Sequence, residues 1–123
     1  MNYTGTIIEE SLENITVLKD LKILKTTVEP ITQNHKTPWL AQWTLHKVEI
    51  PAEQAQDIAE KISRSIDINH ANSWYADFKN EIGHYIIFRD KVFYIENHNP
   101  EEINAVNNYA LSLGIPKHQL PNF

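Results

Sequence analysis

The sequence predicts an α+β fold: one antiparallel, meander-rich β-sheet of about five to six strands with two main α-helices packed on one face. Three short runs, at 74–79, 84–88 and 92–96, are rich in aromatic and β-branched residues and are separated by turn-like residues, which is typical of a β-meander. Two longer segments carry apolar residues at helical spacing. Because no linker-like segment or internal repeat divides the 123 residues, we expect a single domain spanning residues 1–123.

The N-terminal part of the chain is expected to add further strands to this sheet. Residues 3–9 should form one strand, and residues 39–50 should form another that runs directly into a helix. Residues 12–32 are ambiguous, because apolar residues at helical spacing overlap with the β-branched stretch 23–31. For this segment we expect a short turn of helix that leads into a strand.

Both main helices are indicated by an apolar face, and one is also indicated by its ends. The first starts near Pro51, and its buried face should comprise Ala55, Ile58, Ala59, Ile62 and Ile66. The second follows Asn99, a good N-cap, and has Pro100 at its first position. Gly114 and Pro116 end this helix. Its inward stripe should comprise Ile103, Val106, Ala110 and Leu113.

The meander can be paired by hand, because its turns are expected at 80–83 and at 90–91. One face then carries Tyr75, Ile86, Phe88, Phe93 and Ile95, with Asp77, Lys79 and His84 at one end, and this face can take the helices. The opposite face carries Trp74, Ala76, Phe78, Tyr85, Ile87 and Tyr94. If the strand at 39–50 joins in the matching orientation, it extends this aromatic face with Trp39, Ala41, Trp43 and Leu45.

Two apolar faces require a second cover, and three covers fit the sequence, in the order in which we favour them. The N-terminal segment or the tail 117–123 could fold over the aromatic face, a homodimer could bury it, or a small apolar or planar ligand could occupy it. We therefore expect a non-catalytic binding or interaction module that uses its aromatic sheet face for self-association or for such a ligand. Its candidate binding residues are Trp39, Trp43, Trp74, Phe78, Tyr85 and Tyr94.

The alternative hypothesis is a small enzyme with a general acid/base site built from His46, Asp77 and His84. His46 is expected to approach Asp77 and His84 on the face that the helices cover, where a carboxylate that orients an imidazole makes a general base. The second histidine or Lys79 would then act as the acid or oxyanion partner. A structural role explains these residues better, with a hydrogen-bonded histidine at the edge of the core and a solvated rim where the meander turns.

Several function classes are excluded by composition. The chain has no cysteine, which excludes disulfides, thiolate zinc sites and cysteine nucleophiles. Its three glycines cannot form a phosphate-binding loop, and its six histidines lack the spacing at which two of them share a zinc ion, so we expect no cofactor and no metal. The net charge of −5 argues against nucleic acid and anionic lipid as partners. No apolar run is long enough to span a membrane, and no export signal precedes the domain, so we expect a cytoplasmic protein.

Four sequence strings carry a resemblance to a known family. They are Thr37-Pro38-Trp39, the run WTLHKVEI at 43–50, the run WYADFKN at 74–80, and Gly114-Ile115-Pro116. Together they resemble a family of small, uncharacterised bacterial and archaeal proteins, and the resemblance covers nearly the whole chain. It implies no activity, no fold and no functional residue. The tail, which ends in Leu120-Pro121-Asn122-Phe123, departs from the acidic ending of such proteins.

Overall fold

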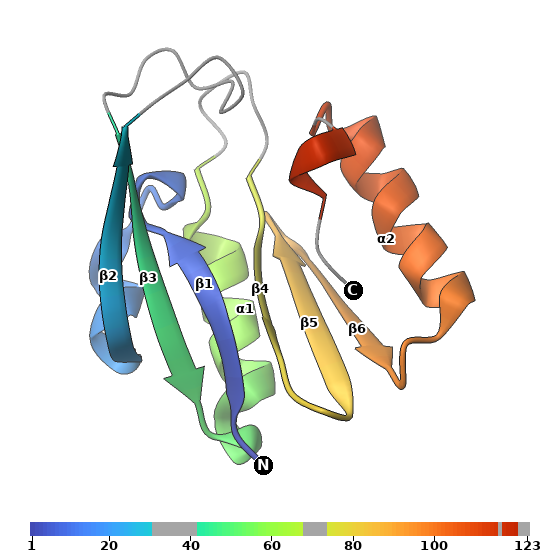
Figure 1. Cartoon of the computed structure of the whole chain (residues 1–123), viewed down its shortest axis with the longest axis horizontal. Helices are drawn as coiled ribbons and strands as arrows, with labels where there is room; N and C mark the ends of the chain where they lie inside the picture. Colours follow the sequence, from blue (N-terminus) through green and yellow to red (C-terminus); the bar gives the residue numbers. More distant parts are fainter. Residues whose placement is uncertain (31–41, 68–73, 116, 121–123) are drawn as a thin grey trace.

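The protein consists of one open, six-stranded antiparallel sheet and two main helices, which confirms the predicted α+β class (Figure 1). The computed structural model describes residues 1–30, 42–67, 74–115 and 117–120. Its strands are β1 (Tyr3–Ile8), β2 (Lys22–Pro30), β3 (Gln42–Ile50), β4 (Ala76–Lys79), β5 (Gly83–Phe88) and β6 (Lys91–Glu96), in the order β2-β3-β1-β4-β5-β6. The main helices are α1 (Ala55–Ser65) and α2 (Pro100–Ser112), and the short 3₁₀ helices are η1 (Glu9–Ser11), η2 (Ile15–Asp20), η4 (Ala52–Gln54) and η5 (Lys117–Gln119).

The two helices form where their sequence signals predict. The side-chain oxygen of Asn99 accepts hydrogen bonds from the backbone N–H groups of Glu101 and Glu102, at 3.0 and 3.3 Å, and so satisfies donors that have no partner within α2. Gly114, with φ +88°, follows the last turn of α2 in the left-handed region. The predicted apolar face of the first helix is buried: Ala55, Ile58, Ala59, Ile62 and Ile66. None of the helices that the structure describes is both long and apolar enough to cross a membrane.

The meander is confirmed, and its second turn lies one position earlier than expected. Ala76 pairs with Ile87 across β4 and β5, as the hand pairing predicts. Phe88 pairs with Lys91, so the second turn consists of residues 89–90 rather than 90–91. The pairing of β5 with β6 therefore shifts by two residues. Because side chains alternate with a period of two, every residue keeps its predicted face.

The N-terminal segments also match their predictions in outline. η2 leads into β2, which is the short helical turn followed by a strand that we expected within 12–32. The strand predicted at 3–9 is β1, which ends at Ile8. Of the strand predicted at 39–50, β3 covers the part from Gln42 onward, and residues 39–41 lie outside the described residues.

β1 occupies the middle of the sheet, between β3 and β4. Thr6 lies opposite Lys47 on one side and opposite Asp77 on the other. Gly5 permits this close packing, because a Cβ at this position would lie 2.6 and 2.7 Å from Cα and Cβ of Phe78. The insertion of β1 therefore determines which side chains of β3 share a face with those of β4.

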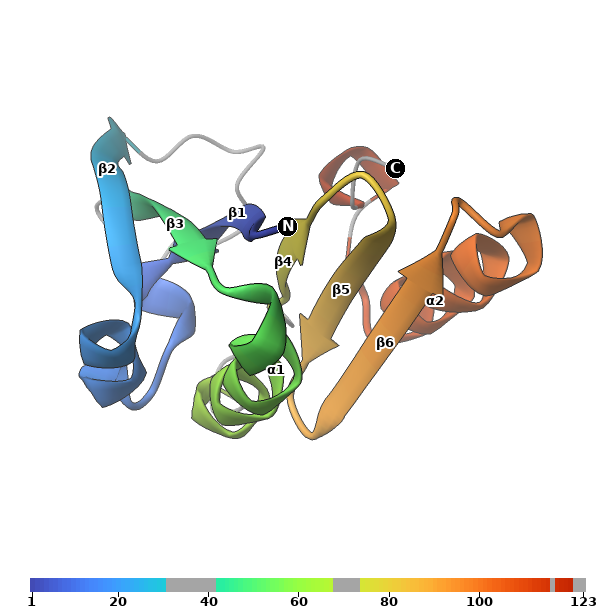
Figure 2. The ribbon, with the colours of Figure 1, turned by 90° about the horizontal axis from the view of Figure 1, so that it is seen from below.

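The two main helices pack on opposite faces of the sheet, so the expectation that both cover one face is wrong. α1 packs against the face that carries Ala76, Phe78, Tyr85 and Ile87. α2 packs against the face that carries Ile86, Phe88 and Ile95. After β6, Asn97 and His98 take φ angles of +54° and +55°, and this turn leads into the N-cap of α2. Figure 2 shows α1 below the sheet, with η5 above it.

The aromatic face predicted from the sequence is thus covered by the chain itself. Phe78 and Tyr85 are only 1% and 9% exposed, and their rings contact each other in the core beneath α1. Among the three covers considered, this corresponds to the chain folding over its own sheet, although α1 provides the cover rather than the tail. Among the described residues, part of the opposite face remains open over β1, β3 and β4, because α2 packs against β5 and β6.

Candidate functional site

Two of the three predicted catalytic residues, Asp77 and His84, are brought together. Asp77 Oδ2 lies 2.7 Å from His84 Nε2 across the β4–β5 hairpin, and because a carboxylate only accepts, Nε2–H donates this hydrogen bond. His84 is buried and Asp77 is partly exposed. Lys79 lies directly opposite His84 on the same face. In the described part of the chain, no group of three or more histidines and carboxylates could hold a metal ion.

The third predicted residue, His46, lies on the other face of the sheet. It is opposite Ile7, which is fully buried in the core beneath α1. Lys47, its neighbour in β3, is the residue that shares a face with Asp77 across β1. The expectation that His46 meets Asp77 and His84 in one acid/base site is therefore wrong.

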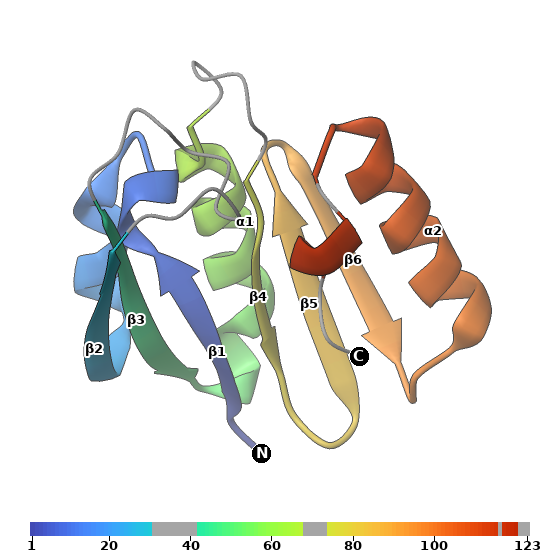
Figure 3. The same cartoon turned by 45° about the horizontal axis from the view of Figure 1, so that its top comes forward.

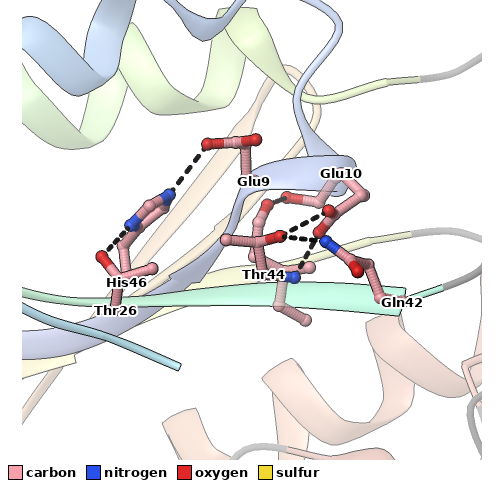
Figure 4. A network of polar contacts seen from close by, with 8 residues as sticks. Glu9, Glu10, Thr26, Gln42, Thr44 and His46 are labelled. Carbon is pink, nitrogen blue, oxygen red and sulfur yellow. Dashed lines mark hydrogen bonds and ion pairs between the residues drawn. The ribbon is translucent and has the colours of Figure 1, made fainter. Parts of the chain in front are cut away.

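His46 instead belongs to a polar network that joins three elements (Figure 4). Its Nδ1 lies 2.9 Å from Thr26 Oγ1 on β2, and its Nε2 lies 3.0 Å from Glu9 Oε1 on η1. The neighbouring carboxylate of Glu10 accepts hydrogen bonds from N–H and Oγ1–H of Thr44 at 2.5 and 2.7 Å, where β3 extends past the end of β1. These contacts tie η1 and β2 to β3, and we assign the network a structural role.

The open part of the α2-side face contains a groove of about 240 Å³. Its floor is formed by β1, β3 and β4, and its wall is formed by the segment that follows α2. We call this feature the groove. The described residues that line it are Thr6, Ile8, Trp43, Leu45, Trp74, Tyr75, Asp77, Ile115 and Gln119. Concave sites that are mostly apolar, with a few polar groups, are typical of small-molecule binding. We take this groove as the candidate functional site.

Tyr75 holds the segment after α2, which forms the wall of the groove, through a hydrogen bond. Its hydroxyl donates a hydrogen bond to the backbone carbonyl of Gln119. Burial raises the pKa of Tyr75, and the nearby carboxylate of Asp77 raises it further. The hydroxyl therefore keeps the proton that it donates well above neutral pH. In Figure 3, η5 is seen in front of β5 and β6, next to α2.

Comparison of the chain with protein-family models, with curated proteins and with solved structures found no match.

Two polar groups stand out in the groove. The indole N–H of Trp74 is buried and has no hydrogen-bond partner within the described residues. The ring of Trp74 contacts that of Trp43, with centroids 5.4 Å apart and planes inclined by 60°. The second polar group is the carboxylate of Asp77, which already accepts from His84 and retains further acceptor positions. The residues that line the groove thus include one buried donor without a described partner and one charged acceptor among apolar side chains.

The candidate binding residues from the sequence fall into separate places. Trp43 and Trp74 line the groove, whereas Phe78 and Tyr85 are core residues that an external partner cannot reach. Tyr94 is 39% exposed and its ring lies against Tyr85, on the α1 side of the sheet. Trp39 lies outside the described residues. The expectation of one continuous aromatic binding face is therefore wrong.

Trp43 and Leu45 were expected on the aromatic face and instead lie on the opposite one. The reason is again the insertion of β1, because Leu45 is opposite Ile8, and both line the groove. Sequence reasoning did not identify Thr6, Ile8, Ile115 or Gln119 as part of a site. Thr6 and Ile8 carried no local signal, because their role depends on a non-local strand pairing. Ile115 was noted only beside the helix end at Gly114, and Gln119 only as part of the tail 117–123 that could cover one face.

Proposed function

We propose that this protein is a non-catalytic binding protein whose groove takes a small, planar and largely apolar ligand. The observation that supports this most directly is the composition of the groove, with Trp43, Ile8, Leu45 and Ile115 as apolar walls and few polar groups. A volume of about 240 Å³ is below that of a site for a drug-sized compound. It therefore favours a molecule of one or two rings.

A binding role fits the groove better than catalysis does. Of the described residues that line it, Asp77 is the only charged one. General acid/base catalysis needs two groups that exchange protons near neutral pH. Tyr75 cannot supply the second group, because its hydroxyl is engaged by Gln119 and its pKa is raised. Asp77 can orient a ligand through a hydrogen bond without transferring a proton.

Self-association through the aromatic face is not supported by the arrangement of the core. Phe78 and Tyr85, its central candidates, are buried by α1 within one chain. A second copy could pair along an edge of the sheet, but β2 carries Lys22, Lys25 and Pro30, together with a register shift between Ile23 and Lys25. Lysines, prolines and bulges at an edge strand oppose such pairing. We therefore favour a small molecule over a second subunit.

The test is a calorimetric titration of the purified protein with benzamide and with indole. We compare the wild type with Trp43→Ala, which removes one wall, and with Leu111→Ala, which removes an exposed apolar side chain on α2 outside the groove. Trp43→Ala should weaken binding at least about tenfold, since burial of a large aromatic surface is lost. Leu111→Ala should leave binding unchanged.

Equal effects of the two variants would show that the groove is not the binding site. Native mass spectrometry of the same preparations reports the subunit count and any retained small molecule in one spectrum. A retained mass that disappears in Trp43→Ala supports the proposal. A dimer that is lost in Trp43→Ala, with no retained mass, would assign this surface to self-association instead.

A further inference from the structure

We infer that the ligand is a neutral aromatic molecule that carries both a hydrogen-bond acceptor and a hydrogen-bond donor, as in aryl amides with a ring amine. The inference rests on the proposed function, because it assigns the chemistry of a ligand in the same groove. It follows from Trp74 and Asp77, which both line the groove and supply complementary polar groups.

The acceptor is required by Trp74. Trp74 is only 6% exposed, yet its indole N–H has no partner among the described residues. A buried donor without a partner costs about 1–3 kcal/mol, and most such groups in folded proteins are satisfied by protein, water or ligand. A carbonyl oxygen of a bound ligand would satisfy it. The contact with Trp43 places an aromatic wall next to this donor, so the acceptor should be attached to a flat ring.

The donor is required by Asp77. One of its oxygens receives the hydrogen bond from His84, and a carboxylate has about four acceptor positions in total. A ligand N–H or O–H can therefore join His84 at the same carboxylate. Lys47 lies in line with Thr6 and Asp77 on the same face, and Lys79 lies two residues further along β4 on that face. A cationic ligand would be opposed by these lysines and an anionic one by Asp77, so a neutral donor is favoured.

The groove also supplies apolar surface for the ring of the ligand. Ile8 and Ile115 lie in the same lining as Trp74 and Asp77. A benzene ring that carries both polar groups is the simplest molecule of this class.

Four compounds of the same shape test the inference by ¹H–¹⁵N NMR titration of the whole protein. They are 4-aminobenzamide, which has both groups; 4-methylbenzamide, which lacks the ring amine; 4-isopropylaniline, which lacks the carbonyl acceptor; and 4-isopropyltoluene, which lacks both. The first should bind tightest, and each loss of one polar group should weaken binding about five- to tenfold. The indole N–H resonance of Trp74, assigned with Trp74→Phe, should move downfield with the two amides only.

Asp77→Asn provides a second and independent comparison. Because a neutral amide is a weaker acceptor than a carboxylate, this variant should weaken the two ring amines several-fold and leave 4-methylbenzamide unchanged. If 4-isopropyltoluene binds as tightly as 4-aminobenzamide, and the Trp74 resonance does not respond to the amides, the inferred ligand class is overturned while the groove remains a binding site. If none of the four compounds binds, the proposed function fails with it.

Discussion

His46 and Asp77 lie on opposite faces of one sheet, because Thr6 of the inserted strand β1 pairs with Lys47 on one side and with Asp77 on the other. The imidazole of His46 is therefore directed to the α1 side, where it contacts Thr26 and Glu9. The carboxylate of Asp77 faces the groove. The two residues serve different purposes, and their substitution should have separable effects on stability and on binding.

His46→Ala should destabilise the protein without changing the groove. The substitution leaves Thr26 and Glu9 without the imidazole that joins them, and the loss of such contacts at a buried histidine costs about 1–3 kcal/mol in free energy of unfolding. Urea denaturation measures this cost, and titration with benzamide measures binding. A variant that keeps its stability but no longer binds would show that His46 belongs to the ligand site after all.

Gly5→Ala should be among the most destabilising substitutions of a single methyl group. The new Cβ would clash with the backbone carbonyl of Asp77 and lie 2.6 Å from Cα of Phe78, so β1 would have to separate from β4. We expect a loss of at least about 2 kcal/mol, since overpacking of this kind commonly costs 1–3 kcal/mol. Gly114→Ala is the matched control, because no atom lies within 4 Å of its Cβ and only its φ of +88° is unfavourable. It should cost about 1 kcal/mol. Equal losses in thermal or urea denaturation would contradict the close packing at Gly5.

The stability of the protein should fall with rising pH above about 10, in part through Tyr94. Burial, followed by the hydrogen bond with Tyr3, raises the pKa of Tyr94 from 10.0 to about 12. The folded state therefore holds this proton more tightly than the unfolded chain does. The resulting stabilisation is complete below pH 10 and is lost as the pH rises toward 12.

Urea denaturation at pH 9, 10 and 11 tests this sign with Tyr94→Phe, which removes the titrating hydroxyl. The variant should lose less stability than the wild type over this range. Part of the loss should persist, because burial also raises the pKa of Tyr85 and of Tyr75. Identical slopes for the two proteins would exclude a role for Tyr94.

Lys25 should keep the edge strand β2 from pairing with a second copy. The apolar side chains of Ile23, Leu24 and Val28 are exposed along this strand. Lys25→Val would leave them without the charge that opposes edge pairing, so self-association should increase with protein concentration in sedimentation velocity experiments. Lys19→Val, on η2 and away from the edge, is the control and should not associate. A wild-type dimer that Lys25→Val leaves unchanged would contradict this role.

The local structure could be predicted from the sequence because each signal involves residues close together in the chain. Asn99 and Gly114 mark the ends of α2 through hydrogen bonds and backbone angles of their own neighbourhood. The pairing of Ala76 with Ile87 follows from a short turn. Even the shifted turn at 89–90 left the predicted faces intact, because the shift was two residues.

The site could not be predicted because it depends on non-local pairing. Alternation predicts that His46 and Trp43 lie on opposite faces of β3, but it does not say which of these faces continues onto β4. The insertion of β1 between the two strands decided this, and it moved Trp43 and Leu45 into the groove and His46 out of it. The choice of face by α1 and α2 was equally open, since both faces of the meander are apolar.

The central claim is that the groove binds a small planar ligand, and ¹H–¹⁵N chemical-shift mapping with benzamide tests it most directly. The account predicts that the perturbed signals cluster at residues that line the groove, including the amides of Ile8, Leu45 and Ile115 and the indole N–H of Trp74. Signals of α1 and of the His46 network should stay in place. Perturbations confined to the α1 side of the sheet, or no perturbation at millimolar benzamide, would contradict the claim.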